Sequence, residues 1–232
     1  MGRSTGAQST TPIEAIDRWI GDHRADLVAR VRDLVAFPTL SPPGRNTAGA
    51  QGYLADWLAG LGCAVDRFEV YPGDPDLVAR LPGTDEAAPS LLFNGHIDVA
   101  EVAADGWQSG PFAATERAGR LYGRGVCDMK GGLAAACFAL EALRACGVRP
   151  RGDLLVESVI GEESGEWGTV ACIERGYRAD LAIVPEPTGL RPCGQGGVIT
   201  GWITIQSPQT LHDGVRARTI HAGGGLVGAN AI

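Results

Sequence analysis

The sequence lacks the features of a membrane-spanning or nucleic-acid-binding protein. No apolar run approaches the roughly 20 residues that a helix needs to cross a bilayer. Positive charge is in deficit, because 27 acidic and 20 basic side chains give a net charge of −7. A balance that acidic argues against a surface dedicated to nucleic acid or anionic lipid. We therefore expect neither nucleic acid nor a membrane as a partner.

Cysteine pairs and a secretory signal are missing as well. No two cysteines form a C-x-x-C pair, so reduced and mostly buried thiols are expected rather than a disulfide framework. The first residues, MGRSTGAQSTTP, are polar and contain no apolar core of a signal peptide. We interpret residues 1–12 as a disordered tail and predict a cytoplasmic protein. The six cysteines are Cys63, Cys127, Cys137, Cys146, Cys172 and Cys193.

Helical and strand-like segments alternate along the rest of the chain. Apolar residues recur at helical spacing over 13–36, where Pro38 ends the run, and a second helix surrounds Tyr53. The segment 131–145 is apolar almost all round, so a buried helix is expected. The other expected elements are a helix at 169–175 and strands at 63–71, 76–81, 90–94, 154–160 and 180–184. This alternation predicts an α/β domain with a largely parallel central sheet, in which ligands gather beyond the carboxyl ends of strands.

The pattern changes after Gly194–Gly197. The next segment, 198–205, reads as a strand that does not continue the preceding alternation of helices and strands. We therefore predict a first domain over 13–196 and the beginning of a second domain over 197–232. A helical pattern starts in the last five residues, and a natural domain rarely ends on the first turn of a helix. The chain is accordingly expected to be C-terminally truncated.

The first two polar clusters contain His96 with Asp98, and Asp128. His96 and Asp98 stand two apart at a strand end and point to the same side; a carboxylate can orient a zinc-binding imidazole there. Glycines around Asp128 permit a tight turn that presents its carboxylate to two cations at a helix N-terminus. Alone, the first cluster is more typical of an isolated polar pair, and Asp128 of an N-cap. Cys127, beside Asp128, is not needed as a nucleophile, because its neighbours are better explained as metal ligands.

Two further clusters supply carboxylates after strands. Glu162 and Glu163 are adjacent, and such carboxylates repel unless a metal or solvent compensates their charge. With a metal present, one can ligate while the other acts as a general base toward water. Glu186 lies between Pro185 and Pro187; alone, it would be a turn residue, and the glutamate pair a solvated acidic turn. Together the four clusters offer nitrogen and oxygen ligands without thiolates, which suits zinc, with cobalt or manganese possible.

These motifs resemble a known family. The run GHIDV…W…GPF…GRLYGRGVCDMKGG…GEESG…PEPT is similar, in order and spacing, to the acetylornithine deacetylase and succinyl-diaminopimelate desuccinylase family over roughly residues 14–232. That family also includes aminoacylases and glutamate carboxypeptidases. The resemblance implies a zinc-peptidase-like α/β catalytic domain holding two zinc ions. It also implies an inserted α+β domain that makes a homodimer.

The resemblance implies metal ligands at four positions. His96 would hold one zinc ion, and Asp128 would bridge the two. Glu163 would bind one ion and Glu186 the other. A last histidine ligand lies near the C-terminus of the catalytic domain in family members, and the sequence after His221 offers no candidate for it.

The resemblance also implies catalytic roles. Asp98 would orient His96, and Glu162 would be the general base that takes a proton from the attacking water and passes it to the leaving amine. A histidine of the inserted domain would stabilise the oxyanion in the partner's active site. Both His212 and His221 are candidates, and the context of His212, in His-Asp-Gly after a strand, favours it slightly.

The implied function is metal-dependent hydrolysis of an amide bond in N-acyl amino acids or related small N-acyl or peptide substrates. The alternative is a non-catalytic truncated paralogue or interaction protein that keeps the first half of the fold. Intact His96, Asp128 and Glu162 favour the enzyme, whereas the missing last histidine favours the alternative for the chain as given.

Overall fold

A computed structural model of the chain describes residues 11–41, 45–165, 167–192, 194, 217–220 and 225–228. The chain divides into two compact units, Met1–Arg191 and Pro192–Ile232. In the second unit the described strands are β8 (Ala217–Ile220) and β9 (Gly225–Gly228), which pair antiparallel. The strand expected at 198–205 and both His212 and His221 lie outside the described residues. The predicted domain boundary after residue 196 stays a prediction.

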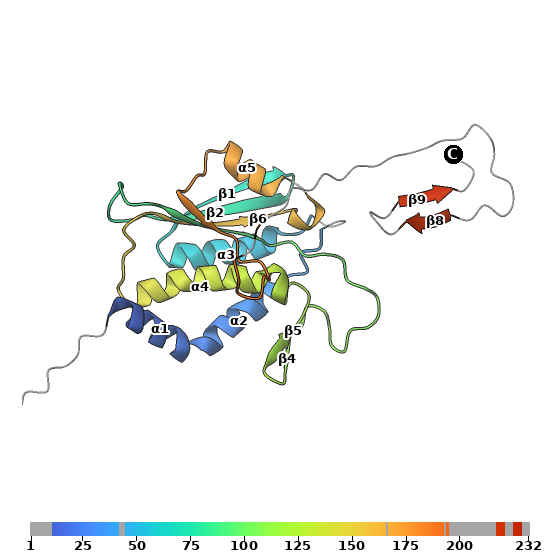
Figure 1. Cartoon of the computed structure of the whole chain (residues 1–232), viewed down its shortest axis with the longest axis horizontal. Coiled ribbons are helices and arrows are strands. Elements are labelled where there is room, and N and C mark those ends of the chain that lie inside the picture. The colour runs from blue at the N-terminus through green and yellow to red at the C-terminus, as the bar shows by residue number, and fades with distance from the viewer. Residues whose placement is uncertain are drawn as a thin grey trace, which may run out of the picture. The chain divides into compact units, whose positions relative to one another are not determined.

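The first unit contains the helices and strands that position the candidate site (Figure 1). Its helices are α1 (Pro12–Asp22), α2 (Arg24–Val35), α3 (Ala48–Gly60), α4 (Gly131–Ala145) and α5 (Gly168–Glu174). Its strands are β1 (Ala64–Tyr71), β2 (Asp74–Leu81), β3 (Leu91–His96), β4 (Thr115–Arg117), β5 (Arg120–Tyr122), β6 (Leu154–Val159) and β7 (Leu181–Ile183). Two short helical turns are η1 (Val126–Lys130) and η2 (Glu162–Ser164).

The central sheet has the strand order β1-β2-β6-β3-β7. β3 pairs parallel with β6 on one side and with β7 on the other, whereas β1–β2 and β2–β6 are antiparallel. The α/β class is confirmed, but the sheet is mixed rather than largely parallel. The tight turn at Pro72-Gly73, where Gly73 has a φ of +77°, accounts for the β1–β2 pair, because a connection that short can join only antiparallel neighbours.

Helices cover both faces of the sheet (Figure 1). The larger core joins α2, α3 and α4 to one face, and it includes Leu34, Leu54 and Phe138. The smaller core lies between the other face and α5, around Val159 and Cys172. The expectation that the 131–145 helix is buried is confirmed, since seven of its residues are buried. These two cores hold β3 and β6 in the centre of three layers.

The single helix expected over 13–36 is wrong, because the chain forms two helices that break at His23. The His23 ring stacks on Trp19 with 4.1 Å between ring centroids, and its Nδ1 lies 2.8 Å from the Trp19 carbonyl oxygen. His23 is therefore half-buried at the break rather than on an open surface. Apolar spacing could not reveal the break, since Trp19 of α1 and Leu27 of α2 pack on the same core.

The described cysteines are free, as expected. Cys63, Cys137 and Cys172 are buried, Cys146 is half-buried and Cys127 is exposed. Among the described residues, no helix combines the length and apolar character that crossing a membrane requires.

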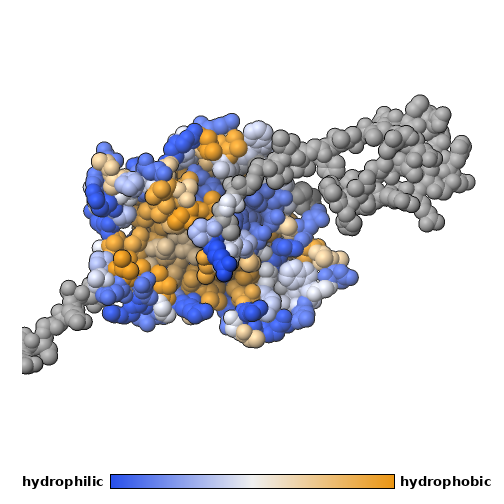
Figure 2. All heavy atoms as spheres, viewed as in Figure 1, coloured by the Kyte–Doolittle hydropathy of each residue, from blue (hydrophilic) through white to orange (hydrophobic). Residues whose placement is uncertain are grey.

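β7 forms one edge of the described sheet and carries exposed apolar side chains. Leu181 is 60% exposed, Ile183 is 47% exposed, and Val184, just beyond the strand, is 54% exposed. Figure 2 shows apolar surface gathered on the viewed face of this unit. A strand in a parallel sheet is usually apolar throughout because both of its faces are covered. β7 has the composition of such a strand, but among the described residues its apolar side chains are left partly exposed.

The buried carboxylate of Asp76, in β2, is hydrogen-bonded to the residue that follows the neighbouring strand β6. Asp76 is fully buried; its Oδ1 accepts a hydrogen bond from the Ile160 amide at 2.9 Å, and its Oδ2 accepts one from the Cys172 thiol at 3.6 Å. Burial raises the pKa of Asp76 to about 7, helped by the charges of Glu157 and Asp74 and opposed by the two hydrogen bonds. The chain at Ile160, where the next turn begins, is therefore anchored by a carboxyl group that can ionise near neutral pH.

The raised pKa of Asp76 predicts a pH-dependent stability. Folded Asp76 holds its proton more tightly than the unfolded chain does, so its stabilising contribution is complete at low pH and is lost as the pH rises from about 4 to about 7. Asp76→Asn keeps an oxygen acceptor for the Ile160 amide and cannot ionise. In urea unfolding across this range, we expect the wild type to lose stability relative to Asp76→Asn as the pH rises. A difference between the two proteins that stays constant with pH would contradict this.

Candidate metal centre

His96 is the last residue of β3, the strand that lies between two parallel neighbours. Its side chain is only 1% exposed. Because the carboxyl ends of parallel strands meet at one edge of a sheet, the residues that follow β6 and β7 approach this imidazole. Glu162 follows β6, and Glu186 follows β7. The sheet therefore brings together residues that are far apart in the sequence.

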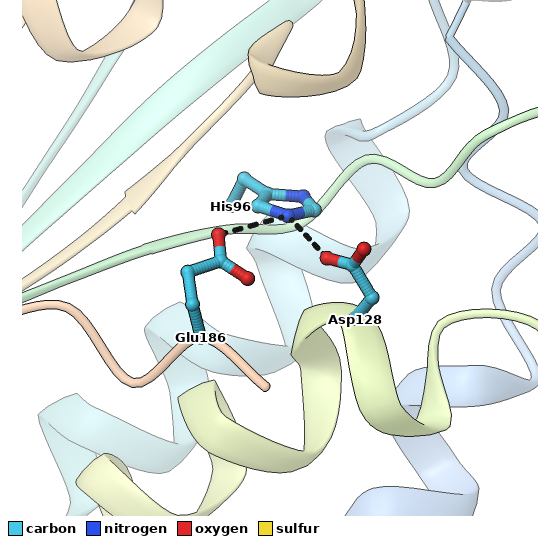
Figure 3. A group of neighbouring side chains, drawn as sticks. All are labelled: His96, Asp128 and Glu186. Carbon is cyan, nitrogen blue, oxygen red and sulfur yellow. Dashed lines mark hydrogen bonds and ion pairs between the residues drawn. The ribbon is translucent and has the colours of Figure 1, made fainter. Parts of the chain in front are cut away.

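The two ring nitrogens of His96 face different partners. Nδ1 lies 2.9 Å from the backbone carbonyl oxygen of Asp98, so a proton on Nδ1 is donated there. Nε2 lies 3.1 Å from Asp128 Oδ1, 3.5 Å from Glu186 Oε1 and 3.7 Å from Glu162 Oε2. Figure 3 shows Asp128 and Glu186 pointing at this nitrogen from two different segments. In the neutral ring with Nδ1 protonated, the free electron pair of Nε2 faces the carboxylates.

Three of these residues form a group that fits a metal ion. One ligand atom each from His96, Asp128 and Glu186 all lie within 4.8 Å of one another. An imidazole nitrogen with carboxylate oxygens is a ligand set that zinc accepts. An excess of carboxylates around one imidazole also calls for positive charge. The donor set and its geometry therefore fit a divalent cation.

The pKa values show how strongly the carboxylates act on the imidazole. Burial lowers the pKa of His96, but the hydrogen bonds and charge of Asp98, with the charge of Glu186, raise it to about 9. Burial and the charges of Asp128 and Glu162 raise the pKa of Glu186 to about 7, although His96 opposes this. A bound cation would therefore compete with protons for both groups.

Asp98 connects the imidazole to the glutamate pair. It is fully buried, and its Oδ1 lies 3.5 Å from His96 Nδ1. The same carboxylate accepts hydrogen bonds from the Glu162 amide at 3.3 Å and from the Glu163 amide at 3.2 Å. Its role as orienter of His96 stays a prediction, and the contacts to the glutamate amides add a second task. One carboxylate thus positions residues that come from two loops.

The two glutamates of the pair lie differently. Glu162 is 56% exposed at its side chain and faces His96. Glu163 lies outside the three-residue group; its Oε1 accepts a hydrogen bond from the Ala100 amide at 3.0 Å. Burial and the charges of Asp128 and Asp98 raise the pKa of Glu163, so its carboxylate lies in the same electrostatic environment. The predicted roles of general base and metal ligand stay predictions.

Asp128 is presented by a turn that leads into α4. Gly125 begins the turn in the left-handed region, with a φ of +80°, and a Cβ there would lie 2.6 Å from Val99 Cγ1. Asp128 itself has an extended backbone, φ −120° and ψ 101°, and α4 begins three residues later at Gly131. The expected tight glycine-bounded turn before a helix is observed, with Asp128 in the turn rather than at the cap.

The residues that follow Asp128 brace the site, which the sequence patterns did not reveal. The Met129 sulfur accepts a hydrogen bond from the His96 amide at 3.1 Å, and Met129 is 1% exposed. Lys130 is fully buried, and burial lowers its pKa to about 7 against the opposing charge of Asp98. A lysine at a helix start is usually solvated, so no signal in the sequence marks it as buried.

Gly132 fixes the distance between α4 and the segment that carries Glu186. A Cβ at Gly132 would lie 2.1 Å from the Pro185 carbonyl oxygen. This oxygen belongs to the backbone, so it cannot move without moving the chain. A side chain here would therefore displace the backbone directly before Glu186.

Gly132→Ala is expected to weaken zinc binding at least tenfold, because it moves Glu186 away from His96 and Asp128. Isothermal titration of the metal-free protein with zinc would measure this. Gly21→Ala, in α1, is the matched control, since a Cβ at Gly21 meets nothing within 4 Å. Equal zinc affinities of the two variants would argue against the close packing as the means of placing Glu186.

Comparison with known proteins finds one matching family and several similar enzymes. The model of peptidase family M20/M25/M40 matches residues 92–218. N-formyl-4-amino-5-aminomethyl-2-methylpyrimidine deformylase of Halalkalibacterium halodurans is 54% identical over 222 residues, which cover 95% of this chain and 52% of the relative. The enzyme of the same name from Bacillus subtilis is 49% identical with the same coverage. Succinyl-diaminopimelate desuccinylase of Gluconacetobacter diazotrophicus is 40% identical over 166 residues, 68% of this chain and 41% of the relative.

Solved structures share the fold. Human carnosine dipeptidase 1 matches with a TM-score of 0.68 and 26% identity, over 75% of this chain and 41% of its own. The M20 family metallo-carboxypeptidase Sso-CP2 of Sulfolobus solfataricus matches with a TM-score of 0.62 and 25% identity, over 69% and 37%. The chain spans about half the length of the deformylases it matches. Since the family model covers more than half of the chain and the motifs resemble the same group of hydrolases, the chain belongs to peptidase family M20/M25/M40.

Proposed function

We propose that the protein is a metal-dependent deformylase that hydrolyses the formamide bond of an N-formyl aminomethylpyrimidine. The observation that carries this proposal is the 54% and 49% identity to two deformylases with that substrate in their name, over 95% of this chain. The desuccinylase is less similar, at 40% identity over 68% of the chain. Formamide hydrolysis is a case of the amide hydrolysis that the motifs of this sequence predict.

Two zinc ions are the proposed cofactor, with cobalt or manganese as possible substitutes. His96 and Glu186 would each bind one ion, Asp128 would bridge both, and Glu163 would complete the set. The hydrogen bond from Ala100 occupies one oxygen of Glu163 and leaves the second for a cation. Bound zinc would supply Lewis acidity toward the amide carbonyl and make water a nucleophile at neutral pH.

Glu162 is the proposed general base. Its side chain is half exposed, so that water and substrate can reach it, and its backbone amide is fixed by Asp98. In the proposed reaction Glu162 takes a proton from water as the water oxygen adds to the formyl carbon. Glu162 then delivers this proton to the amine nitrogen as the C–N bond breaks. The products are formate and the aminomethylpyrimidine with its free amine.

A homodimer is part of the proposal. In it, His212 or His221 would stabilise the negative charge on the carbonyl oxygen in the partner's site. Donors placed where charge develops in the transition state lower the barrier. The small-molecule substrate would then be enclosed by residues of two chains.

The substrate proposal predicts a ranking among acyl groups. We expect the protein, supplied with zinc, to release formate from the N-formyl aminomethylpyrimidine at least a hundredfold faster, in kcat/KM, than it cleaves N-succinyl-diaminopimelate. A formate-specific assay and an amine-specific assay would measure the two reactions. Faster cleavage of the succinyl substrate would overturn the proposed substrate. It would still be consistent with the proposal that the protein hydrolyses amide bonds.

Glu162→Ala is expected to lower kcat at least about a hundredfold, the lower range for loss of a general base, and to leave zinc binding within a few-fold. The carboxylate lies farther from His96 Nε2 than those of Asp128 and Glu186 do. Turnover measured beside zinc titration separates the two effects. Glu86→Ala, at an exposed glutamate of a turn, is the control. Near-native turnover of Glu162→Ala would make the assignment of the base wrong.

A further inference from the structure

We propose that Lys130 is a positioning residue that locks the Asp128 turn against the segment 34–41 and so sets the geometry of the metal centre. The proposal rests on the proposed metal centre and not on the choice of substrate. It adds to the reaction a residue that touches neither the ligand atoms nor the substrate. The argument depends on where the ammonium group of Lys130 goes.

Lys130 extends into the interior, where its ammonium group reaches the end of α2. Its Nζ donates hydrogen bonds to the carbonyl oxygens of Leu34 at 3.0 Å and of Phe37 at 2.7 Å. The last carbonyl groups of a helix have no partner within the helix, and a cation is favoured at that end. Burial of a lysine is costly unless such partners are present. The bonds therefore hold the turn and α2 together at a defined distance.

The segment 34–41 also contacts the loop that follows His96. The Thr39 hydroxyl donates to the Ile97 carbonyl oxygen at 2.6 Å, and the Val99 amide donates to the Thr39 carbonyl oxygen at 2.8 Å. The Ser41 amide in turn donates to the Val99 carbonyl oxygen at 3.0 Å. Asp98 lies within this short paired stretch.

The same segment reaches the turn that carries the glutamate pair. Ser41 Oγ lies 3.3 Å from Ser164 Oγ, at the end of η2. Three loops that carry the site residues are thus attached to one segment, and Lys130 provides the attachment for the Asp128 turn. Without that attachment, the turn would keep its own backbone bonds but lose its fixed distance from the other two loops.

The space around Lys130 suits its aliphatic stem. A Cβ at Gly125 would lie 3.3 Å from Lys130 Cδ and 2.6 Å from Val99 Cγ1, so stem, glycine and valine are in close contact. Methionine would fill much of the same volume without donors or charge, which makes Lys130→Met the informative substitution.

The test compares Lys130→Met with Arg144→Met in the metal-free protein. Arg144 Nη1 donates to the carbonyl oxygen of Gly60 at the end of α3 at 2.5 Å, so it offers the same type of contact in a different place. We expect Lys130→Met to bind zinc about 10–100-fold more weakly, the range for loss of a group that supports metal ligands. We also expect the visible absorption of the cobalt-substituted protein to change. Arg144→Met should alter neither quantity.

An unchanged zinc affinity and cobalt spectrum in a folded Lys130→Met protein would overturn the proposal. If Lys130→Met does not fold, Thr39→Val decides, because it removes the hydroxyl donor to Ile97 from the same segment and keeps the side-chain shape. A severalfold weaker zinc affinity of Thr39→Val would support the brace, and wild-type affinity would overturn it. Failure of the wild type to cleave the formyl substrate would affect only the proposed reaction, because these measurements read metal binding.

Discussion

Crowding of negative charge around one buried imidazole is the constraint on which the site depends. Two unit charges 4 Å apart interact by about 4 kcal/mol at the effective dielectric constant near a protein surface. Carboxylate oxygens of Asp128 and Glu186 lie within 4.8 Å of each other, so these two carboxylates repel when both are ionised. The fold keeps them together by fixing their backbones through hydrogen bonds, strand ends and close glycine contacts. The side chains concerned are those of Asp98, Asp128, Glu162 and Glu186, all within 3.7 Å of a His96 nitrogen.

Much of the site could be predicted because parallel strands deliver their last residues to one edge. His96 ends β3, whereas Glu162 follows β6 and Glu186 follows β7, and these three strands are neighbours in the sheet. The antiparallel direction of β1 and β2 is encoded by the short turn between them and not by apolar spacing, because that spacing does not depend on strand direction. The orientation of Glu163 toward Ala100 depends on a contact between loops 63 residues apart, which no local pattern specifies.

The short run from Asp128 to Gly132 shows why a motif can be specific over so few residues. Three positions of the run contact different segments: Met129 contacts the amide of His96, Lys130 the end of α2, and Gly132 the backbone before Glu186. At these three positions the run is therefore constrained by tertiary packing rather than by its own helix propensity. Local reasoning finds the carboxylate and overlooks the three supports.

The position of β3 between β6 and β7 has a consequence for how the protein acquires its metal. The residues that pair with β3 lie about 60 residues away in β6 and about 90 residues away in β7, so long loops must close before the ligands meet. A cation therefore cannot nucleate folding here, as it does in a zinc finger whose ligands are near neighbours. A cation bound here would instead add to the stability of the folded state by mass action, because its ligands come together only in that state.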